Sequence, residues 1–545
     1  MKQSEKRTRR LGGWGFEGED FEPSEQLLTW LTKRVGPAGP PLRGDKIPIP
    51  DLKPRALPEI PLEVTFDSRD RLFHARGQGL PDIIRLRTGT VNAVPDGIVR
   101  PSNSREVEAV LAACRGRGIR IVPWGGGTSV TGGVNRPSGD ESVLCMELER
   151  MADLVDLDTA SGLAVFGPGT TGPKVELSLA EHGFTLGHFP QSWELATVGG
   201  WVATRSSGQE SLGYGRIEDM VAGLEVVSPS GRLHLPTLPA SAAGPDLRQL
   251  IMGSEGRLGI ITQATLRVRP RPQLTNVDAY LVPNINRGLD AVRDLVWAGI
   301  PLSMARLSDP QETTVAMAIG LGSSSFAPLV QGYLRLRGIR NDGCMMLVGA
   351  NGRPEIVGDT LAGARSILST HRAVSLGRRP GRHWLRDRFR HPYLREALLD
   401  RGWATDTLET AVPWSKTLAT REKVVSALEN ALSGENERAA VLCHISHPYI
   451  DGTSLYFTFF FRCASDTDAT ISRWAQLKRA ASEALVNCGA TITHHHGIGV
   501  WHAPWLKAET GELGLEMLSA AVQRMDPERI LNPEVLLDPT DRLEV

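Results

Sequence analysis

The stretch Pro123-Trp-Gly-Gly-Gly-Thr-Ser129 decides the fold, because it places three successive glycines directly after a predicted strand, Ile119–Val122. Glycine reaches positive φ without strain, so its backbone can approach a ligand closely. Successive amides in such a turn form a nest for an anion, and the hydroxyls of Thr128 and Ser129 add donors. A tight surface turn would also suit a glycine run. The spacing fits neither G-x-G-x-x-G nor a pattern ending in Gly-Lys-Ser/Thr, which excludes Rossmann and P-loop nucleotide sites.

Outward from this loop, helix and strand patterns alternate, and the expected fold class is α+β. A helix is expected over Ser104–Gly118, with Ser104 as its capping residue. The aromatic run Leu455–Phe461 predicts a buried strand in which Tyr456, Thr458 and Phe460 share one face. The other predicted strands are Leu154–Leu157, Leu163–Phe166, Val221–Val227 and Gly259–Val268, and the other predicted helices are Pro173–His182, Asn286–Ala298 and Thr420–Leu432.

Length and composition narrow the class of protein. A chain of 545 residues is too long for one core. Its net charge of −1 lacks the basic surplus of a nucleic-acid binder, and no apolar run is long enough to span a bilayer. Six cysteines without a C-x-x-C pair favour a reducing compartment, so we expect a cytoplasmic protein. The basic stretch Met1–Arg10 has no apolar segment behind it and is expected to be a flexible leader rather than a secretory signal.

Two further blocks rich in small and hydroxyl residues follow the glycine loop, at Gln191–Gly208 and Gly253–Thr262. In this order the three blocks resemble the FAD-binding domain of the vanillyl-alcohol oxidase / p-cresol methylhydroxylase family over residues 93–273. The resemblance implies a two-subdomain FAD-binding domain with an α+β cap domain for the substrate. It divides the chain into an N-terminal segment (1–92), the FAD-binding domain (93–273), the cap (274–490) and a C-terminal segment that returns to the active site (491–545).

The same resemblance implies which residues bind FAD. They are Pro123, Trp124, Gly125, Gly126, Gly127, Thr128, Ser129, Gln191, Ser192, Thr197, Thr204, Arg205, Ser206, Ser207, Glu255, Gly256, Leu258, Gly259, Ile260 and Ile261. Some members of the family attach the flavin covalently through a histidine just after the loop glycines. Thr128 stands at that position here, so FAD is expected to bind non-covalently.

Three more segments, Gly12–Phe16, Asp70–Gly77 and Phe189–Val202, resemble the alkyldihydroxyacetonephosphate synthase branch of that family. The branch implies an FAD-dependent transferase of ether lipid synthesis. Such an enzyme exchanges the acyl chain of acyl-dihydroxyacetone phosphate for a long-chain fatty alcohol, with flavin N5 holding the three-carbon unit and no net redox change. The resemblance also implies a homodimer.

A tyrosine and three histidines are the candidate catalytic residues. A buried phenol needs a polar partner, and with an ordinary pKa of about 10 it needs nearby cations or donors to act as a base. A core tyrosine bonded to a carbonyl is the alternative for Tyr456. The run His494-His495-His496 lacks the spacing of a zinc site, so no metal site is predicted. In an extended segment His494 and His496 would share a face and His495 would point away. The resemblance gives Tyr456 the proton transfer and places His494, His495 and His496 beside it.

Two arginines are candidates for binding the substrate. A guanidinium pairs naturally with phosphate or carboxylate, and the resemblance implies this role for Arg395 and Arg306. Arg395 lies in the basic stretch Arg378–Arg401, so a surface position is the alternative. Aromatic residues interleave with the basic ones there, which suits either an anionic membrane surface or a solvated loop.

Two other functions remain open from the sequence. Arginine and histidine around a flavin would also serve a flavin-dependent oxidoreductase of the 2-hydroxyacid dehydrogenase type. The second alternative is a non-catalytic flavin- or lipid-binding protein, against which the clustered ionisable residues argue.

Overall fold

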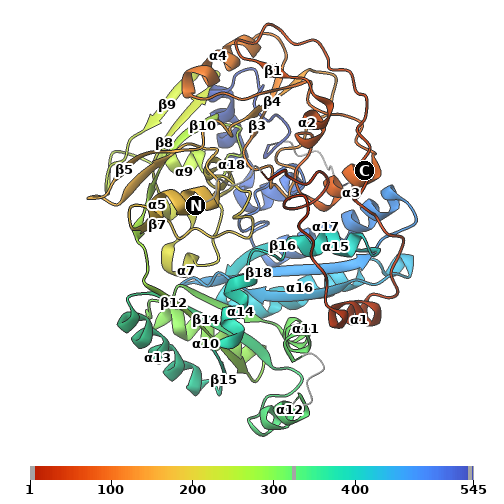
Figure 1. Cartoon of the computed structure of the whole chain (residues 1–545), viewed down its shortest axis with the longest axis vertical. Coiled ribbons are helices and arrows are strands. Elements are labelled where there is room, and N and C mark those ends of the chain that lie inside the picture. Colours follow the sequence, from red (N-terminus) through yellow and green to blue (C-terminus); the bar gives the residue numbers. More distant parts are fainter. Residues whose placement is uncertain (1–6, 322–326, 538–542, 544–545) are drawn as a thin grey trace.

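The computed structural model describes residues 7–321, 327–537 and 543, and the strands of this part form four sheets. The two largest sheets mark two lobes, the upper and the lower in Figure 1. The mixture of helices and sheets confirms the expected α+β class.

The upper lobe carries the glycine loop and contains two main sheets. A four-stranded sheet in the order β1-β2-β4-β3 runs parallel from β2 to β3, and a five-stranded antiparallel sheet has the order β5-β6-β10-β8-β9. The bounds are β1 Val64–Thr65, β2 Gly97–Val99, β3 Arg120–Trp124, β4 Val143–Glu147, β5 Leu154–Asp158, β6 Leu163–Phe166, β8 Val221–Ser228, β9 Gly231–Leu235 and β10 Ile260–Arg267. A two-stranded sheet pairs β7 (Phe184–Thr185) with β11 (Arg269–Pro270). The glycine loop follows β3 directly, as predicted.

The lower lobe is built on one seven-stranded sheet in the order β15-β12-β14-β13-β17-β18-β16. Its strands are β12 Leu274–Val282, β13 Met304–Ser308, β14 Cys344–Gly352, β15 Val374–Gly377, β16 Trp403–Pro413, β17 Ala440–Ile445 and β18 Gly452–Arg462. Strand β18, which lies next to the edge strand β16, confirms the predicted aromatic strand. Phe457, Phe459 and Phe461 enter the main core, whereas Tyr456 and Thr458 are only partly buried and lie on the other face.

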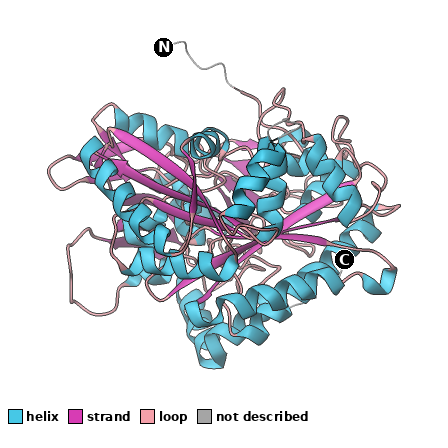
Figure 2. Ribbon diagram, turned by 90° about the horizontal axis from the view of Figure 1, so that it is seen from below, coloured by secondary structure: helices cyan, strands magenta, loops and turns pink. Residues whose placement is uncertain are grey.

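Helices lie on both sides of the strands (Figure 2). Those of the upper lobe and the N-terminal segment are α1 Glu25–Arg34, α2 Ser68–Phe73, α3 Leu80–Thr88, α4 Ser104–Cys114, α5 Gly172–Ala180, α6 Val198–Thr204, α7 Ser211–Tyr214, α8 Ile217–Met220 and α9 Leu247–Ile251. Those that follow are α10 Ile285–Trp297, α11 Pro310–Leu321, α12 Ala327–Leu336, α13 Pro354–Thr370, α14 Arg379–Asp387, α15 Tyr393–Leu399, α16 Thr417–Asn430, α17 Thr467–Cys488 and α18 Ala503–Met525, with short 3-10 turns at Trp414–Lys416 and Ser433–Glu435. Within the described part of the chain, no helix has the length and apolar character needed to cross a bilayer.

Local sequence explains where α4 begins, with one correction. The residue that caps it is Asn103, whose side chain accepts a hydrogen bond from the amide of Glu106, and not Ser104, which is already helical. Asparagine and serine cap about equally well, so the sequence alone did not separate these neighbours.

The N-terminal segment is a second correction. Residues 1–6 lie outside the described residues, but from residue 7 the expected leader packs against both lobes. Arg9 donates to the carbonyl oxygen of Gly126 over 2.7 Å, and Trp14 packs with Leu195 and Tyr393. Hence this segment joins the glycine loop to α15 of the lower lobe.

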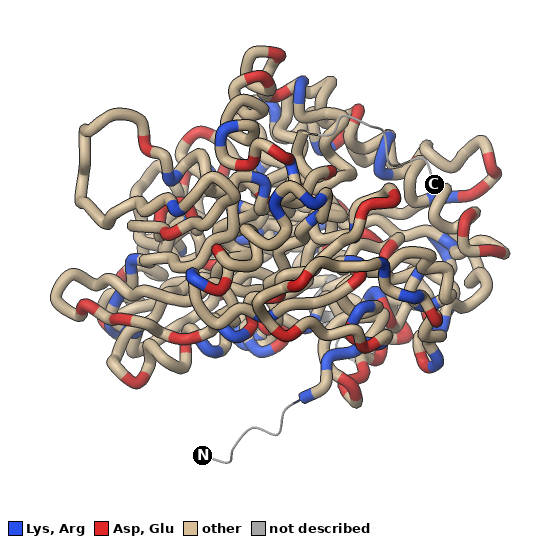
Figure 3. Tube along the Cα trace, turned by 90° about the horizontal axis from the view of Figure 1, so that it is seen from above, with Lys and Arg blue, Asp and Glu red and all other residues tan. Residues whose placement is uncertain are grey.

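The C-terminal residues cross back to the upper lobe. Leu531 forms a parallel bridge to Ile121 of β3, and the side chain of Asn532 donates to the carbonyl oxygens of Gly133 and Glu255. Figure 3 shows basic and acidic residues interspersed along the trace, in keeping with the net charge of −1.

Candidate active site

The glycine loop has the free donors that a pyrophosphate requires. Among the described residues, none accepts a hydrogen bond from the amides of residues 125–129. Gly127 adopts φ 64°, which turns successive amides toward one side. A Cβ built on Gly126 would collide with the carbonyl oxygen of Leu195, and one on Gly125 with the hydroxyl of Thr197, so both positions require glycine. The loop therefore fits the phosphates of FAD.

The second predicted block, Gln191–Gly208, lies against this loop at Leu195 and Thr197. Thr197 caps α6, whereas the Thr204 hydroxyl bonds back to Gly200 within the same helix. The side chain of Gln191 donates to the carbonyl oxygen of Arg388 in the lower lobe over 2.7 Å, and Ser192 forms the turn that precedes Leu195. Arg205 adopts φ 52° and points its guanidinium toward Gln249, near the surface.

The hydroxyls of Ser206 and Ser207 are buried and meet histidines. Ser206 lies 3.1 Å from Nε2 of His188, and Ser207 lies 3.3 Å from Nδ1 of His447. His447 belongs to the lower lobe, so this block reaches the interface between the lobes. Trp124, the last residue of β3, has its ring centroid 4.9 Å from that of His74.

The third block, Gly253–Thr262, ties the upper lobe to the histidine segment His494–His496. Glu255 is buried and accepts hydrogen bonds from the amides of Ile498 and Gly499. Burial raises its pKa to about 7, although these amides oppose the shift. Gly256 packs on Pro123, since a Cβ there would lie 2.5 Å from the proline ring. The remaining predicted residues of this block are Leu258, Gly259, Ile260 and Ile261; the three apolar side chains lie in the domain core, which leaves contact with a cofactor to the backbone.

Tyr456 lies in a row of polar side chains across three strands of the large sheet. On β18 it faces Glu409 of β16 and His444 of β17, and residues directly opposite in antiparallel strands share a face. The rings of Tyr456 and His444 stack at 4.8 Å, and His496 meets the tyrosine edge-on at 6.1 Å. Burial raises the pKa of the Tyr456 phenol above its usual range, so the phenol is protonated at neutral pH.

Arg306 reaches this row through His444. Its guanidinium lies 3.1 Å from Nδ1 of His444 and 2.7 Å from the carboxylate of Glu312. Burial opposes ionisation of Glu312, but His444 and Arg306 lower its pKa to about 2. The structure thus brings Arg306 and Tyr456 into one network.

The three histidines divide between two partners, which corrects the predicted arrangement. His494 and His495 both turn to Glu409, with Nδ1 3.5 Å and 2.7 Å from its carboxylate oxygens, and only His496 turns to Tyr456. The prediction that His494 and His496 share a face is wrong because this segment bends instead of running as a strand. Burial opposes ionisation of Glu409, but His495 and His494 hold its pKa well below the usual range.

Arg395, on α15, is linked through Gln78 to the end of the glycine loop. It binds the carboxylate of Glu396 and both the backbone and the side-chain oxygen of Gln78. Gln78 in turn donates from its amide to the carbonyl oxygen of Ser129. The alternative of a free surface arginine is wrong for Arg395.

Several residues of the site escaped the sequence argument. Glu409 was not a candidate, because its role depends on the pairing of β16 with β18. His447 and Tyr449 follow β17, and the Tyr449 hydroxyl lies 2.5 Å from Nε2 of His494. Nothing in their local spacing marks them. No strand was predicted over Ala440–Ile445, so a position near a strand end did not mark His447 either.

Comparisons with known proteins agree with this geometry. Residues 95–235 match the family model described as "FAD binding domain", and residues 271–536 match "FAD linked oxidases, C-terminal domain". Among solved structures, an alkyldihydroxyacetonephosphate synthase superposes with a TM-score of 0.80 at 27% identity, covering 96% of this chain and 98% of that one. p-Cresol methylhydroxylase superposes with a TM-score of 0.64 at 14% identity over 87% and 93% of the two chains, which shows a shared fold.

A curated relative shows to which family this chain belongs. The alkyldihydroxyacetonephosphate synthase of Trypanosoma brucei brucei is 32% identical over 492 residues, which cover 87% of this chain and 78% of the relative. The resemblance drawn from the sequence is thereby confirmed, and so is FAD as the cofactor. The chain is an FAD-binding enzyme and belongs to the alkyldihydroxyacetonephosphate synthase family, within the wider vanillyl-alcohol oxidase / p-cresol methylhydroxylase group.

Proposed function

We propose that this enzyme exchanges the acyl chain of an acyl-dihydroxyacetone phosphate for a long-chain alcohol, forming an ether bond and releasing a fatty acid. The observation that carries the proposal is Tyr456, a phenol stacked on His444 and met edge-on by His496 in a row that also contains a carboxylate. The overall exchange consumes no electrons, so it requires proton transfer and positioning from the protein rather than an electron acceptor.

The row supplies the proton transfer that this exchange requires. When the alcohol oxygen bonds to carbon, the alcohol must lose its proton, and the departing carboxylate needs stabilisation. Tyr456 rests as a proton donor because burial raises its pKa, and the Arg306 guanidinium, acting in the opposite direction, favours the phenolate form. The phenol can therefore give a proton and take one back within a turnover. When FAD is bound, its flavin ring would supply the reactive group that takes up the three-carbon unit.

A phosphate needs a cationic anchor, and Arg395 is the candidate beside the glycine loop. Its guanidinium is held by Gln78 and Glu396, which fixes the fork in one orientation. Gln78 and Glu396 occupy both two-pronged edges of the guanidinium, so a phosphate would bind there by replacing one of them, in a geometry that a single ammonium group does not reproduce. Arg306, in the network with Tyr456, is the second cation proposed to face the substrate.

The test is anaerobic incubation of the FAD-loaded enzyme with palmitoyl-dihydroxyacetone phosphate. We expect the flavin absorbance to fall only when this substrate is present, and ether product to form when hexadecanol is added without any electron acceptor. A 2-hydroxyacid dehydrogenase would instead be bleached by a 2-hydroxyacid and would recover only with an acceptor. No spectral response to either substrate would favour a binding protein and contradict the proposal.

A homodimer, a cytoplasmic location and membrane contact stay predictions. The Arg378–Arg401 stretch is not uniformly solvated: Arg379, Arg382 and Arg386 are exposed, but Arg388 is buried against Glu210 of the upper lobe at 2.6 Å. We propose that the exposed arginines meet an anionic membrane surface.

A further inference from the structure

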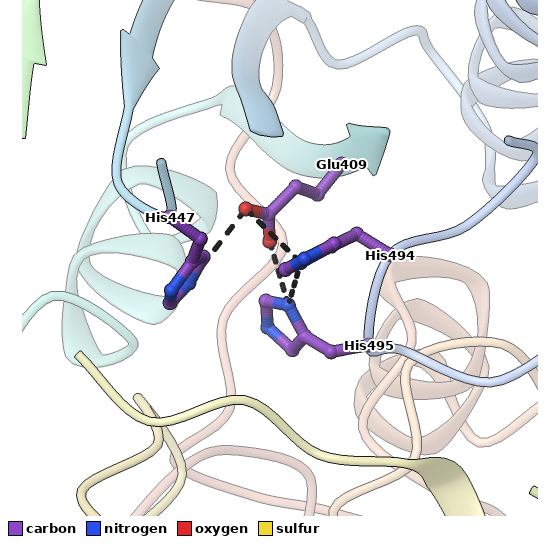
Figure 4. Close-up of side chains that lie close together, drawn as sticks. All are labelled: Glu409, His447, His494 and His495. Atoms are coloured by element: carbon purple, nitrogen blue, oxygen red, sulfur yellow. Dashed lines mark hydrogen bonds and ion pairs between the residues drawn. The ribbon is translucent and has the colours of Figure 1, made fainter. Parts of the chain in front are cut away.

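Four donor side chains converge next to the tyrosine row. Glu409, His447, His494 and His495 each offer one ligand atom, and these four atoms lie within 4.8 Å of one another. Figure 4 shows the carboxylate of Glu409 with His447 on one side and His494 and His495 on the other. They come from β16, from the connection between β17 and β18, and from the segment after α17, so only the folded chain assembles them. Spacing along the sequence could not indicate this set.

The distances within the cluster suit a small cation. Nδ1 of His495 lies 2.7 Å from Glu409, Nδ1 of His494 lies 3.0 Å from Nδ1 of His495, and Nε2 of His447 lies 3.8 Å from Glu409. Ligands of a tetrahedral zinc ion, each at about 2.1 Å, lie about 3.4 Å apart. The observed separations bracket that value, so small side-chain movements would bring all four atoms to ligand distance.

Outer hydrogen bonds orient two of the imidazoles in the way that metal-binding histidines require. Nδ1 of His447 lies 2.9 Å from the Ser211 hydroxyl, which leaves Nε2 to face the centre. Nε2 of His494 lies 2.5 Å from the Tyr449 hydroxyl, which leaves Nδ1 to face the centre. Metal ligands in proteins commonly have such a second partner, which fixes the tautomer and the ring orientation.

We propose that Glu409, His447, His494 and His495 bind one divalent transition-metal ion of the zinc type. Three imidazoles and one carboxylate form a nitrogen-rich set that favours zinc over magnesium or calcium. Four protein ligands close the coordination shell, as in structural sites. The ion would clamp the histidine segment to β16 and to the β17–β18 connection, and would thereby fix His496 against Tyr456.

Metal analysis of the FAD-loaded full-length enzyme tests the site. After treatment with a chelator and dialysis against zinc, we expect one zinc ion per chain by mass spectrometry, and a higher Tm than that of the stripped enzyme. Glu409→Gln and His447→Gln should each lose most of the zinc and the rise in Tm. His371→Gln is the matched control, because His371 pairs with Asp294 instead of the cluster and should retain one ion.

Two outcomes would overturn the proposal. One is wild-type enzyme that holds no zinc and shows no change of Tm at millimolar zinc, which would make the cluster a hydrogen-bonded network only. The other is full zinc content in Glu409→Gln. Near-UV circular dichroism shows whether each variant is folded, and the wild-type titration decides the question if a variant is not. None of these readouts depends on the substrate, so they are separate from the proposed exchange.

Discussion

At the scale of single residues, Tyr456 gives the sharpest test of the proposed chemistry. Tyr456→Phe keeps the ring stacked on His444 and removes only the hydroxyl. We expect flavin content and Tm to change little, while kcat falls about 10²–10⁴-fold, the usual contribution of a general acid–base group. Steady-state kinetics and thermal unfolding measure the two effects. A less stable but fully active variant would show that the phenol is structural.

Gly126 tests the glycine loop. Positive φ belongs to Gly127, whereas Gly126 is constrained by the carbonyl oxygen of Leu195. Gly126→Ala should therefore displace the loop and lower the flavin content of the purified protein, measured as the ratio of flavin to protein absorbance. Gly358→Ala is the control, since a Cβ there meets nothing within 4 Å. Equal flavin in both variants would mean that the loop is only a turn.

Glu255 predicts a pH effect on stability. Burial raises its pKa from 4.5 to about 7 in the folded protein, so the fold favours the protonated form. Its contribution is fully present below pH 4.5 and is lost as the pH rises through about 7. Glu255→Gln cannot ionise, so the free energy of unfolding of the variant, relative to wild type, should rise across this window. Denaturant titrations at several pH values measure it, and a constant difference would exclude the effect.

At the scale of elements, the N-terminal segment supports the cofactor loop from outside. Arg9 donates to the carbonyl oxygen of Gly126 over 2.7 Å, with its guanidinium over the ring of Phe73 at 5.0 Å. A hydrogen bond from a charged group contributes roughly 1.5–3 kcal/mol, so Arg9→Ala should weaken FAD binding about tenfold or more. Fluorescence titration of apoprotein with FAD measures this. Arg10→Ala, whose side chain binds Glu19 instead, should leave the Kd unchanged.

Helices and strands could be predicted from the sequence where apolar residues recur at a regular spacing. They were missed where their position depends on pairing between distant strands. β6 matches its prediction, and β18 differs only at its ends, because alternation or an apolar run is a local signal. The strand β16 was missed, and with it the row of Glu409, Tyr456 and His444. Register between strands distant in sequence depends on tertiary packing, so Tyr456 could be named as a candidate, but Glu409 and the geometry of the row could not be predicted. The histidine segment shows the same limit, since its bends determine which ring meets which partner.

At the scale of the whole molecule, the flavin should be held by non-covalent contacts that both lobes support. By the family resemblance, Thr128 stands where some members carry a covalently linked histidine, and it offers no ring nitrogen to link. Acid precipitation should therefore release the yellow chromophore into the supernatant, and added FAD should raise the Tm by mass action. Absorbance of the supernatant and thermal scans at several FAD concentrations measure both. Yellow colour retained by the washed precipitate would reveal a covalent bond.

The position of Trp14 between Leu195 and Tyr393 has a consequence for synthesis on the ribosome. Trp14 is translated 379 residues before Tyr393 (393 − 14). At about 5–20 residues per second, this separation is roughly 20–75 s. During that interval the flavin domain can emerge and fold while the N-terminal segment still lacks half of its docking surface. Newly made chains should therefore acquire their full affinity for FAD only late in translation, after the cap has emerged.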